Sequence, residues 1–197
     1  KPAGDWAAEC IYRNGKFYYY VTVESTKGGR AVAVGVADKP DGPFKEAYNR
    51  HMAGPNWDYI DPTVFVDDDD QAYIYWGNPK LYYAKLKEDM ITIDGQINVT
   101  DMSRGFAPNG ESSKYTEGPW IHKRGNKYYM IYASHGIPEK ISYSWSDSPT
   151  GPWEWKGVIL DQHSGFAFTS HAGIIEFKGR AFIFYHTAKL PGGGGYN

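Results

Sequence analysis

The feature that most constrains the fold of this 197-residue chain is a repeat of about 55 residues. Four segments share a run of aromatic residues after a polar turn, and their matching aromatic positions lie 56, 55 and 54 residues apart. An apolar run precedes each turn, so each repeat predicts a β-hairpin. The matching aromatic residues are Phe17, Tyr73, Tyr128 and Phe182, and the first strands are predicted at residues 8–12, 63–66, 119–122 and 173–177.

A third strand is predicted in each of the three complete repeats, at residues 30–37, 80–86 and 140–145. The turns 38–44 and 147–153 are similar in sequence and lie 109 residues apart, which is two periods. The 17 Tyr, 23 Gly and 12 Pro are typical of an all-β chain with many turns. Repeats made only of strands predict the blades of a β-propeller, and the fixed period argues against the alternative, a β-sandwich.

The repeats fill the chain, so we expect residues 1–197 to form a single β-propeller domain in which about four blades are present. The fourth repeat stops after its second strand, ahead of residues 192–197, and we expect an open ring that is cut short at both ends. An open blade edge exposes unpaired backbone groups. Self-association through these edges is therefore expected.

Composition excludes several classes of partner. The 21 Lys and Arg nearly balance the 23 Asp and Glu, and no basic run stands out to bind nucleic acid. No apolar stretch approaches the roughly 20 residues that cross a bilayer, so no membrane partner is expected. The single cysteine, Cys10, stands in an apolar run and is expected to be a core thiol. No signal peptide is expected within residues 1–197.

Polar residues recur at one position of the repeat. Aligning the repeats on their first strands puts Ala7, Asp61, Glu117 and His171 at equivalent positions, just ahead of the strand expected to run nearest the propeller axis. Taken singly, Asp61 is interpreted as a turn residue before proline, Glu117 as a solvated loop residue and His171 as a structural histidine. Taken together, they predict one pocket that collects groups from three blades.

Four segments then carry a resemblance. They are residues 59–65 (YIDPTVF), 75–78 (YWGN), 115–120 (YTEGPW) and 170–177 (SHAGIIEF), and they resemble the motifs of family 43 glycoside hydrolases. The resemblance covers essentially the whole chain. It implies a five-bladed β-propeller that hydrolyses arabinofuranosyl or xylosyl linkages with inversion.

The resemblance also implies roles for individual residues. Glu117 would be the general acid that protonates the leaving oxygen, and Asp61 would tune the pKa of that acid and hold it in place. His171 would lie at the base of the pocket, near the sugar or near an axial metal, often calcium. Trp6 and Trp120 are expected to stack on sugar rings, with Asn78 also binding substrate.

Inversion needs a second carboxylate as base, and the family places it in the first blade, which this sequence does not match. We therefore keep two functions open beside that of a propeller used only as a scaffold. One is a hydrolase of arabinoxylan or xylo-oligosaccharides, secreted or periplasmic in its parent protein, acting on plant cell-wall polysaccharide. The other is a non-catalytic carbohydrate-binding propeller fragment that lacks the base. The four aspartates 67–70 are interpreted as a solvated turn rather than a calcium loop.

Overall fold

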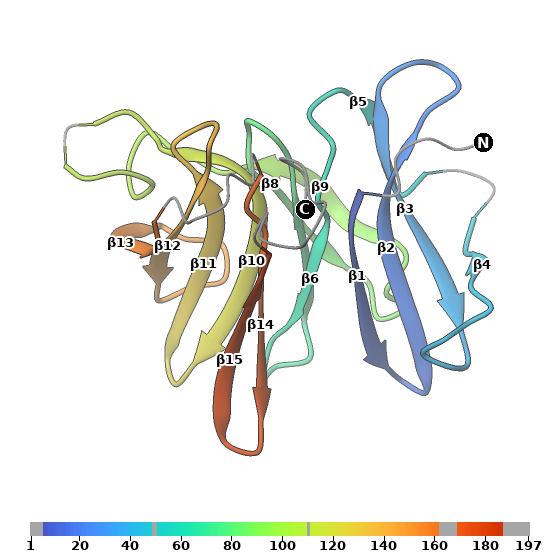
Figure 1. The fold of residues 1–197 in the computed structure, drawn as a ribbon. Coiled ribbons are helices and arrows are strands. Elements are labelled where there is room, and N and C mark those ends of the chain that lie inside the picture. The colour runs from blue at the N-terminus through green and yellow to red at the C-terminus, as the bar shows by residue number, and fades with distance from the viewer. Residues whose placement is uncertain (1–5, 49–50, 110, 162–168, 187–197) are drawn as a thin grey trace, which may run out of the picture. The chain divides into compact units, whose positions relative to one another are not determined.

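The computed structural model describes residues 6–48, 51–109, 111–161 and 169–186, and these form fifteen β-strands and no helix (Figure 1). The chain divides into two compact units, residues 1–99 and residues 100–197. Residues 192–197, ahead of which the fourth repeat is expected to stop, lie outside the described residues. The prediction of an all-β chain is confirmed for the part that is described.

The first unit holds two antiparallel sheets. Strands β1 to β4 pair in chain order and β5 also pairs with β3, while β6 to β9 form a second sheet in chain order (Figure 1). The strands of this unit are β1 (Trp6–Arg13), β2 (Lys16–Glu24), β3 (Arg30–Ala37), β4 (Lys45–Glu46), β5 (Ala53–Asn56), β6 (Thr63–Val66), β7 (Ala72–Trp76), β8 (Tyr82–Leu86) and β9 (Ile93–Val99).

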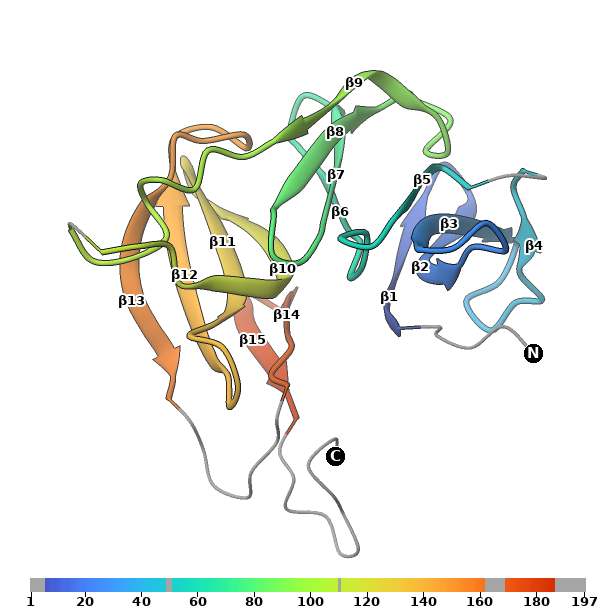
Figure 2. The same ribbon diagram turned by 90° about the horizontal axis from the view of Figure 1, so that it is seen from above.

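The second unit holds a four-stranded sheet and a hairpin. Strands β10 to β13 pair in chain order, and Figure 2 shows them side by side in yellow to orange. Strands β14 and β15 form a two-stranded sheet. The strands of this unit are β10 (Tyr115–Arg124), β11 (Lys127–Ser134), β12 (Lys140–Ser146), β13 (Glu154–Leu160), β14 (Ala172–Phe177) and β15 (Arg180–Tyr185).

All four predicted hairpins are present, as β1–β2, β6–β7, β10–β11 and β14–β15. The two similar turns are also equivalent, because the N–H of Gly42 donates to Lys39 at 3.1 Å and the N–H of Gly151 donates to Ser148 at 3.2 Å. The outer strands β4, β5, β9 and β13 were not predicted. Their sequences lack long apolar runs, because an outer strand exposes most of its side chains to water.

The core of the first unit lies where β2, β3, β7 and β8 contribute alternate side chains. Trp76 is fully buried and stacks on Tyr82 with 5.8 Å between ring centroids, so it belongs to the core. The prediction for Cys10 is wrong, because its side chain is exposed. Neighbouring Ile11 packs against the core instead, since successive residues of a strand point to opposite faces.

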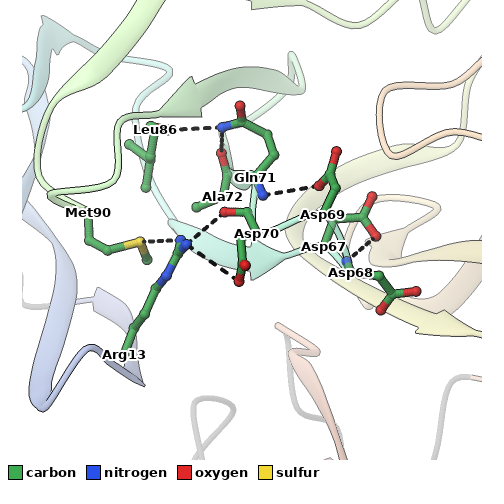
Figure 3. A network of polar contacts seen from close by, with 9 residues as sticks. All are labelled: Arg13, Asp67, Asp68, Asp69, Asp70, Gln71, Ala72, Leu86 and Met90. Atoms are coloured by element: carbon green, nitrogen blue, oxygen red, sulfur yellow. Dashed lines mark hydrogen bonds and ion pairs between the residues drawn. The ribbon is translucent and has the colours of Figure 1, made fainter.

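The run of four aspartates forms the turn between β6 and β7, as predicted. The N–H of Asp70 donates to the carbonyl of Asp67 at 3.0 Å, and the Asp69 carboxylate accepts the N–H of Gln71 at 3.0 Å. Figure 3 shows Arg13 at the end of β1 reaching this turn, where it donates to the carbonyl of Asp70 at 2.7 Å. The turn therefore joins the two sheets of the first unit.

The part of the chain described here holds no helix long and apolar enough to cross a membrane.

Candidate active site

The second unit brings Glu117 and His171 together beside a glycine. Glu117 lies in β10 opposite Ala133, and the register between β10 and β11 shifts on both sides of it. Gly118 follows with φ of +59°, and a Cβ there would lie 3.1 Å from the Cε1 and Nε2 atoms of His171. The absence of a side chain at Gly118 therefore leaves the space that the imidazole ring occupies.

The electrostatics of this site leave His171 neutral. Burial of the ring disfavours the imidazolium form and lowers the pKa of His171 below its ordinary value. The charge of Glu117 acts in the opposite direction, and His186 adds to the effect of burial. Since burial is the largest effect, His171 carries a neutral imidazole at neutral pH, able to donate one hydrogen bond and accept another.

Asp61 lies in the first unit, in the loop between β5 and β6, where only 5% of its surface is exposed. Its φ of +58° is in the left-handed region, which aspartate tolerates better than most residues. Its N–H donates to Oγ1 of Thr22 at 3.1 Å. The N–H of Gly77 donates to the carbonyl of Ile60 at 2.8 Å. Contacts from β2 and from the chain after β7 thus fix the Asp61 backbone.

The sequence analysis missed Glu9, a carboxyl that contacts the strand after Asp61. The N–H of Val64 in β6 donates to Oε2 of Glu9 at 2.7 Å. The residue as a whole is half-buried, and its carboxyl group is the part removed from water. That burial raises the pKa of Glu9 to about 7, and the hydrogen bond from Val64 offsets part of the rise. The available signal was a charged residue inside the otherwise apolar run 6–12.

The other predicted substrate residues of the first unit lie at its loops. Asn78 follows β7, and its N–H donates to the carbonyl of Asp58 at 3.0 Å. Trp6 begins β1 with 41% of its surface exposed, and the guanidinium of Arg30 lies 4.5 Å from the centroid of its ring. The indole ring of Trp6 thus makes a cation–π contact with Arg30.

Trp120 belongs to the packing of the second unit. It lies in β10 and packs against a buried cluster that includes Ile131, Ile141 and Ala172. A Cβ on Gly173 would lie 3.4 Å from its ring. This close contact with β14 gives Trp120 a structural role, and its stacking on a sugar stays a prediction.

The structure thus brings Glu117 and His171 together within one unit, whereas Asp61 lies in the other. The convergence of Asp61 with these two residues stays a prediction, as does the substrate role of Asn78.

The described residues do not supply a calcium site. Among them, no three His, Cys, Asp or Glu side chains gather as a metal-ligand set. Calcium prefers six to eight oxygen ligands, whereas His171 offers one nitrogen. A calcium ion at His171 would therefore depend on water, or on residues outside the described ranges, for nearly all of its ligands.

Antiparallel sheets of four or five strands that follow one another along the chain are typical of the blades of a β-propeller. A carboxyl group held beside a neutral imidazole is suited to proton transfer. The chain is therefore a β-propeller with a candidate acid–base site. It belongs to the glycosyl hydrolases family 43, whose family model matches residues 1–197. The family model confirms the family predicted from the motifs, and the sheets, together with similar solved structures, confirm the predicted propeller fold.

Named relatives agree with this assignment. The chain is 29% identical to a beta-xylosidase of Xylanibacter ruminicola, over 92% of this chain and 64% of the relative. It is also 29% identical to xylosidase/arabinosidase 43A of Humicola insolens, over 95% of this chain and 67% of the relative. The chain therefore spans 64% and 67% of the lengths of these two relatives.

Solved structures are similar too. An alpha-L-arabinofuranosidase from Clostridium thermocellum superposes with a TM-score of 0.77 at 34% identity, over 95% of this chain and 63% of that chain. A GH43 beta-xylosidase/alpha-arabinofuranosidase from a compost microbial metagenome, in complex with xylotriose and in calcium-free form, gives a TM-score of 0.82 at 26% identity. That match covers 97% of this chain and 67% of that chain.

Proposed function

We propose that the protein is an inverting glycoside hydrolase that releases arabinofuranosyl or xylosyl units from arabinoxylan or xylo-oligosaccharides. The observation that carries this proposal is Glu117, placed beside the neutral imidazole of His171 in a chain of family 43. The names of the relatives, which are xylosidases and arabinosidases, support the class of substrate.

In this proposal Glu117 is the general acid and protonates the glycosidic oxygen as the bond to the anomeric carbon breaks. Asp61 tunes the pKa of that acid, and His171, Trp6, Trp120 and Asn78 bind the sugar. An inverting reaction also needs a carboxylate about 6.5–9.5 Å from the acid, to activate water on the opposite face of the ring. No described residue is assigned as that base.

The test is hydrolysis of aryl arabinofuranosides and aryl xylosides by the purified protein and its Glu117→Gln variant. Loss of the acid should lower the rate roughly 100- to 10,000-fold. The deficit should be larger for an alkyl xyloside than for a nitrophenyl xyloside, because a poor leaving group depends more on protonation. Glu111→Gln, the same change at an exposed residue of the same unit, is the control.

Equal deficits for good and poor leaving groups would contradict the assignment of Glu117 as the acid. Turnover by the chain alone would mean that the base lies within residues 1–197. Sugar binding without any turnover would favour the second function, a carbohydrate-binding propeller fragment without its base.

We also propose self-association through the edge of β15. The sheet of β14 and β15 has two strands among the described residues, and most of its large apolar residues are exposed. The exposed side chains are Ile175, Phe177, Phe182, Ile183, Phe184 and Tyr185. Within the described part of the chain β15 pairs only with β14, and exposed apolar surface beside such an edge favours pairing with another chain.

A further inference from the structure

We infer that Trp57 and Arg30 form an outer sugar-binding position, which contacts a second residue of an oligosaccharide beyond the sugar that stacks on Trp6. This inference rests on the proposed function, because it assumes that the end of the first sheet where Trp6 lies binds a saccharide.

The three residues lie at one end of the first sheet. Trp6 begins β1 opposite Thr22, near the end of β2. Arg30 begins β3 and pairs with both Glu24, the last residue of β2, and Asn56, the last residue of β5. Trp57 directly follows Asn56. The chain continues from Trp57 to Asp61 in four residues, so the exposed indole stands on the same loop as the proposed pKa modulator.

One guanidinium group orders both indole rings. The guanidinium carbon of Arg30 lies 4.5 Å from the ring centroid of Trp6 and 5.9 Å from that of Trp57. Its Nη1 also donates to the backbone carbonyl of Trp57 at 3.2 Å. Arg30 thus contacts two aromatic rings at the same end of the sheet and adds hydrogen-bond donors beside them.

Core packing does not account for Trp57. Its surface is 69% exposed, whereas Tyr59, two residues later, is buried against Trp76 with 5.4 Å between ring centroids. The backbone that carries Trp57 is nevertheless fixed. The N–H of Asp58 donates to Oδ1 of Asn56 at 3.0 Å, and Oδ2 of Asp58 accepts the hydroxyl of Tyr82 at 2.9 Å. A rigid loop that presents an exposed indole is preorganised for binding.

The chemistry of this surface suits a neutral saccharide. An indole face packs against the apolar C–H face of a sugar ring, and guanidinium N–H groups donate to ring hydroxyls. Two indole rings that both contact one guanidinium group offer more contact than a single sugar uses. The occupant is therefore a xylo-oligosaccharide rather than free xylose.

The experiment compares the affinities for xylotriose and xylose by calorimetry, in a Glu117→Gln background that prevents turnover. Trp57→Ala should weaken xylotriose binding roughly two- to tenfold, as expected for one aromatic contact, and should weaken xylose binding less. Trp57→Phe should restore most of the affinity. Tyr12→Ala is the matched control, because it removes a ring of similar exposure, 62%, near the opposite end of β1.

Unchanged xylotriose affinity in Trp57→Ala, an equal loss for both sugars, or no binding of xylotriose by the parent would each overturn the inference. The aryl-glycoside assay separates this result from the proposed function. If the parent protein hydrolyses aryl glycosides and Trp57→Ala leaves xylotriose binding unchanged, only the outer position is overturned. A binding loss specific to xylotriose, in a protein without turnover, supports the outer position and contradicts the hydrolase.

Discussion

The buried carboxyl of Glu9 should make the protein less stable as the pH rises from weakly acidic to neutral. Burial raises its pKa from 4.5 to about 7 in the folded state. Between these two values the folded protein keeps a proton on Glu9 that the unfolded chain gives up. The stability that depends on protonated Glu9 is therefore fully present below about pH 4.5 and is lost as the pH rises through about 7. A shift of this size corresponds to about 3 kcal/mol at most.

Glu9→Gln tests this reasoning directly. The amide oxygen of glutamine can still accept the N–H of Val64, but the side chain never ionises. Urea unfolding of the variant and the parent should give similar stabilities near pH 4.5. At pH 8 the variant should be the more stable protein. The difference between the two curves isolates the contribution of Glu9 from that of the other ionisable groups.

Glu46→Gln makes the same change at an exposed position of the same sheet and should leave the pH profile unaltered. Parallel stability profiles for Glu9→Gln and the parent from pH 4.5 to 8 would refute the argument. They would mean that the carboxyl of Glu9 is as well solvated in the folded protein as in the unfolded chain.

Three further predictions concern single contacts. Gly118→Ala should cost about 1–2 kcal/mol, because alanine is strained at positive φ, and should move the NMR signals of the His171 ring; unchanged signals would contradict the close contact. Thr22→Val leaves the buried N–H of Asp61 without its acceptor and should cost about 1–3 kcal/mol in urea unfolding, whereas Thr22→Ser should cost much less; equal losses would contradict the hydrogen bond. Ile183→Lys should shift any associated species toward monomer in sedimentation velocity, and an unchanged distribution would place the association elsewhere.

The repeat predicted the hairpins well because it reports a local property. Two apolar runs around a polar turn pair with each other wherever the rest of the chain lies. The alignment of the repeats also located a shared irregularity. Ala7 and Asp61, at equivalent positions, both have positive φ, and Gly118 has it one residue after Glu117. A departure from regular strand geometry at this position is thus a property of the repeat and not of one blade.

Features that depend on contacts between sheets could not be read from the sequence. The burial of Glu9 depends on Val64, 55 residues away, and the exposure of Cys10 depends on which face of β1 meets the core. The exposure of Trp57 could not be predicted either, because an aromatic residue in a loop can be buried in the core or exposed to water. These are questions of which face a side chain occupies, and strand patterns fix this only when one face is uniformly apolar.

The neutral state of His171 depends on how Glu117, Gly118 and His171 pack together in the second unit. A protonated imidazole beside Glu117 would favour the ionised carboxylate, which cannot serve as a proton donor. Burial outweighs the attraction of Glu117 and keeps the ring uncharged, so the neighbouring carboxyl is not held in its ionised form by an imidazolium. That burial requires the ring to pack against the backbone at Gly118, where any Cβ would stand 3.1 Å from it. The glycine after the proposed acid therefore acts on the chemistry indirectly, by giving the imidazole a position in which it stays neutral.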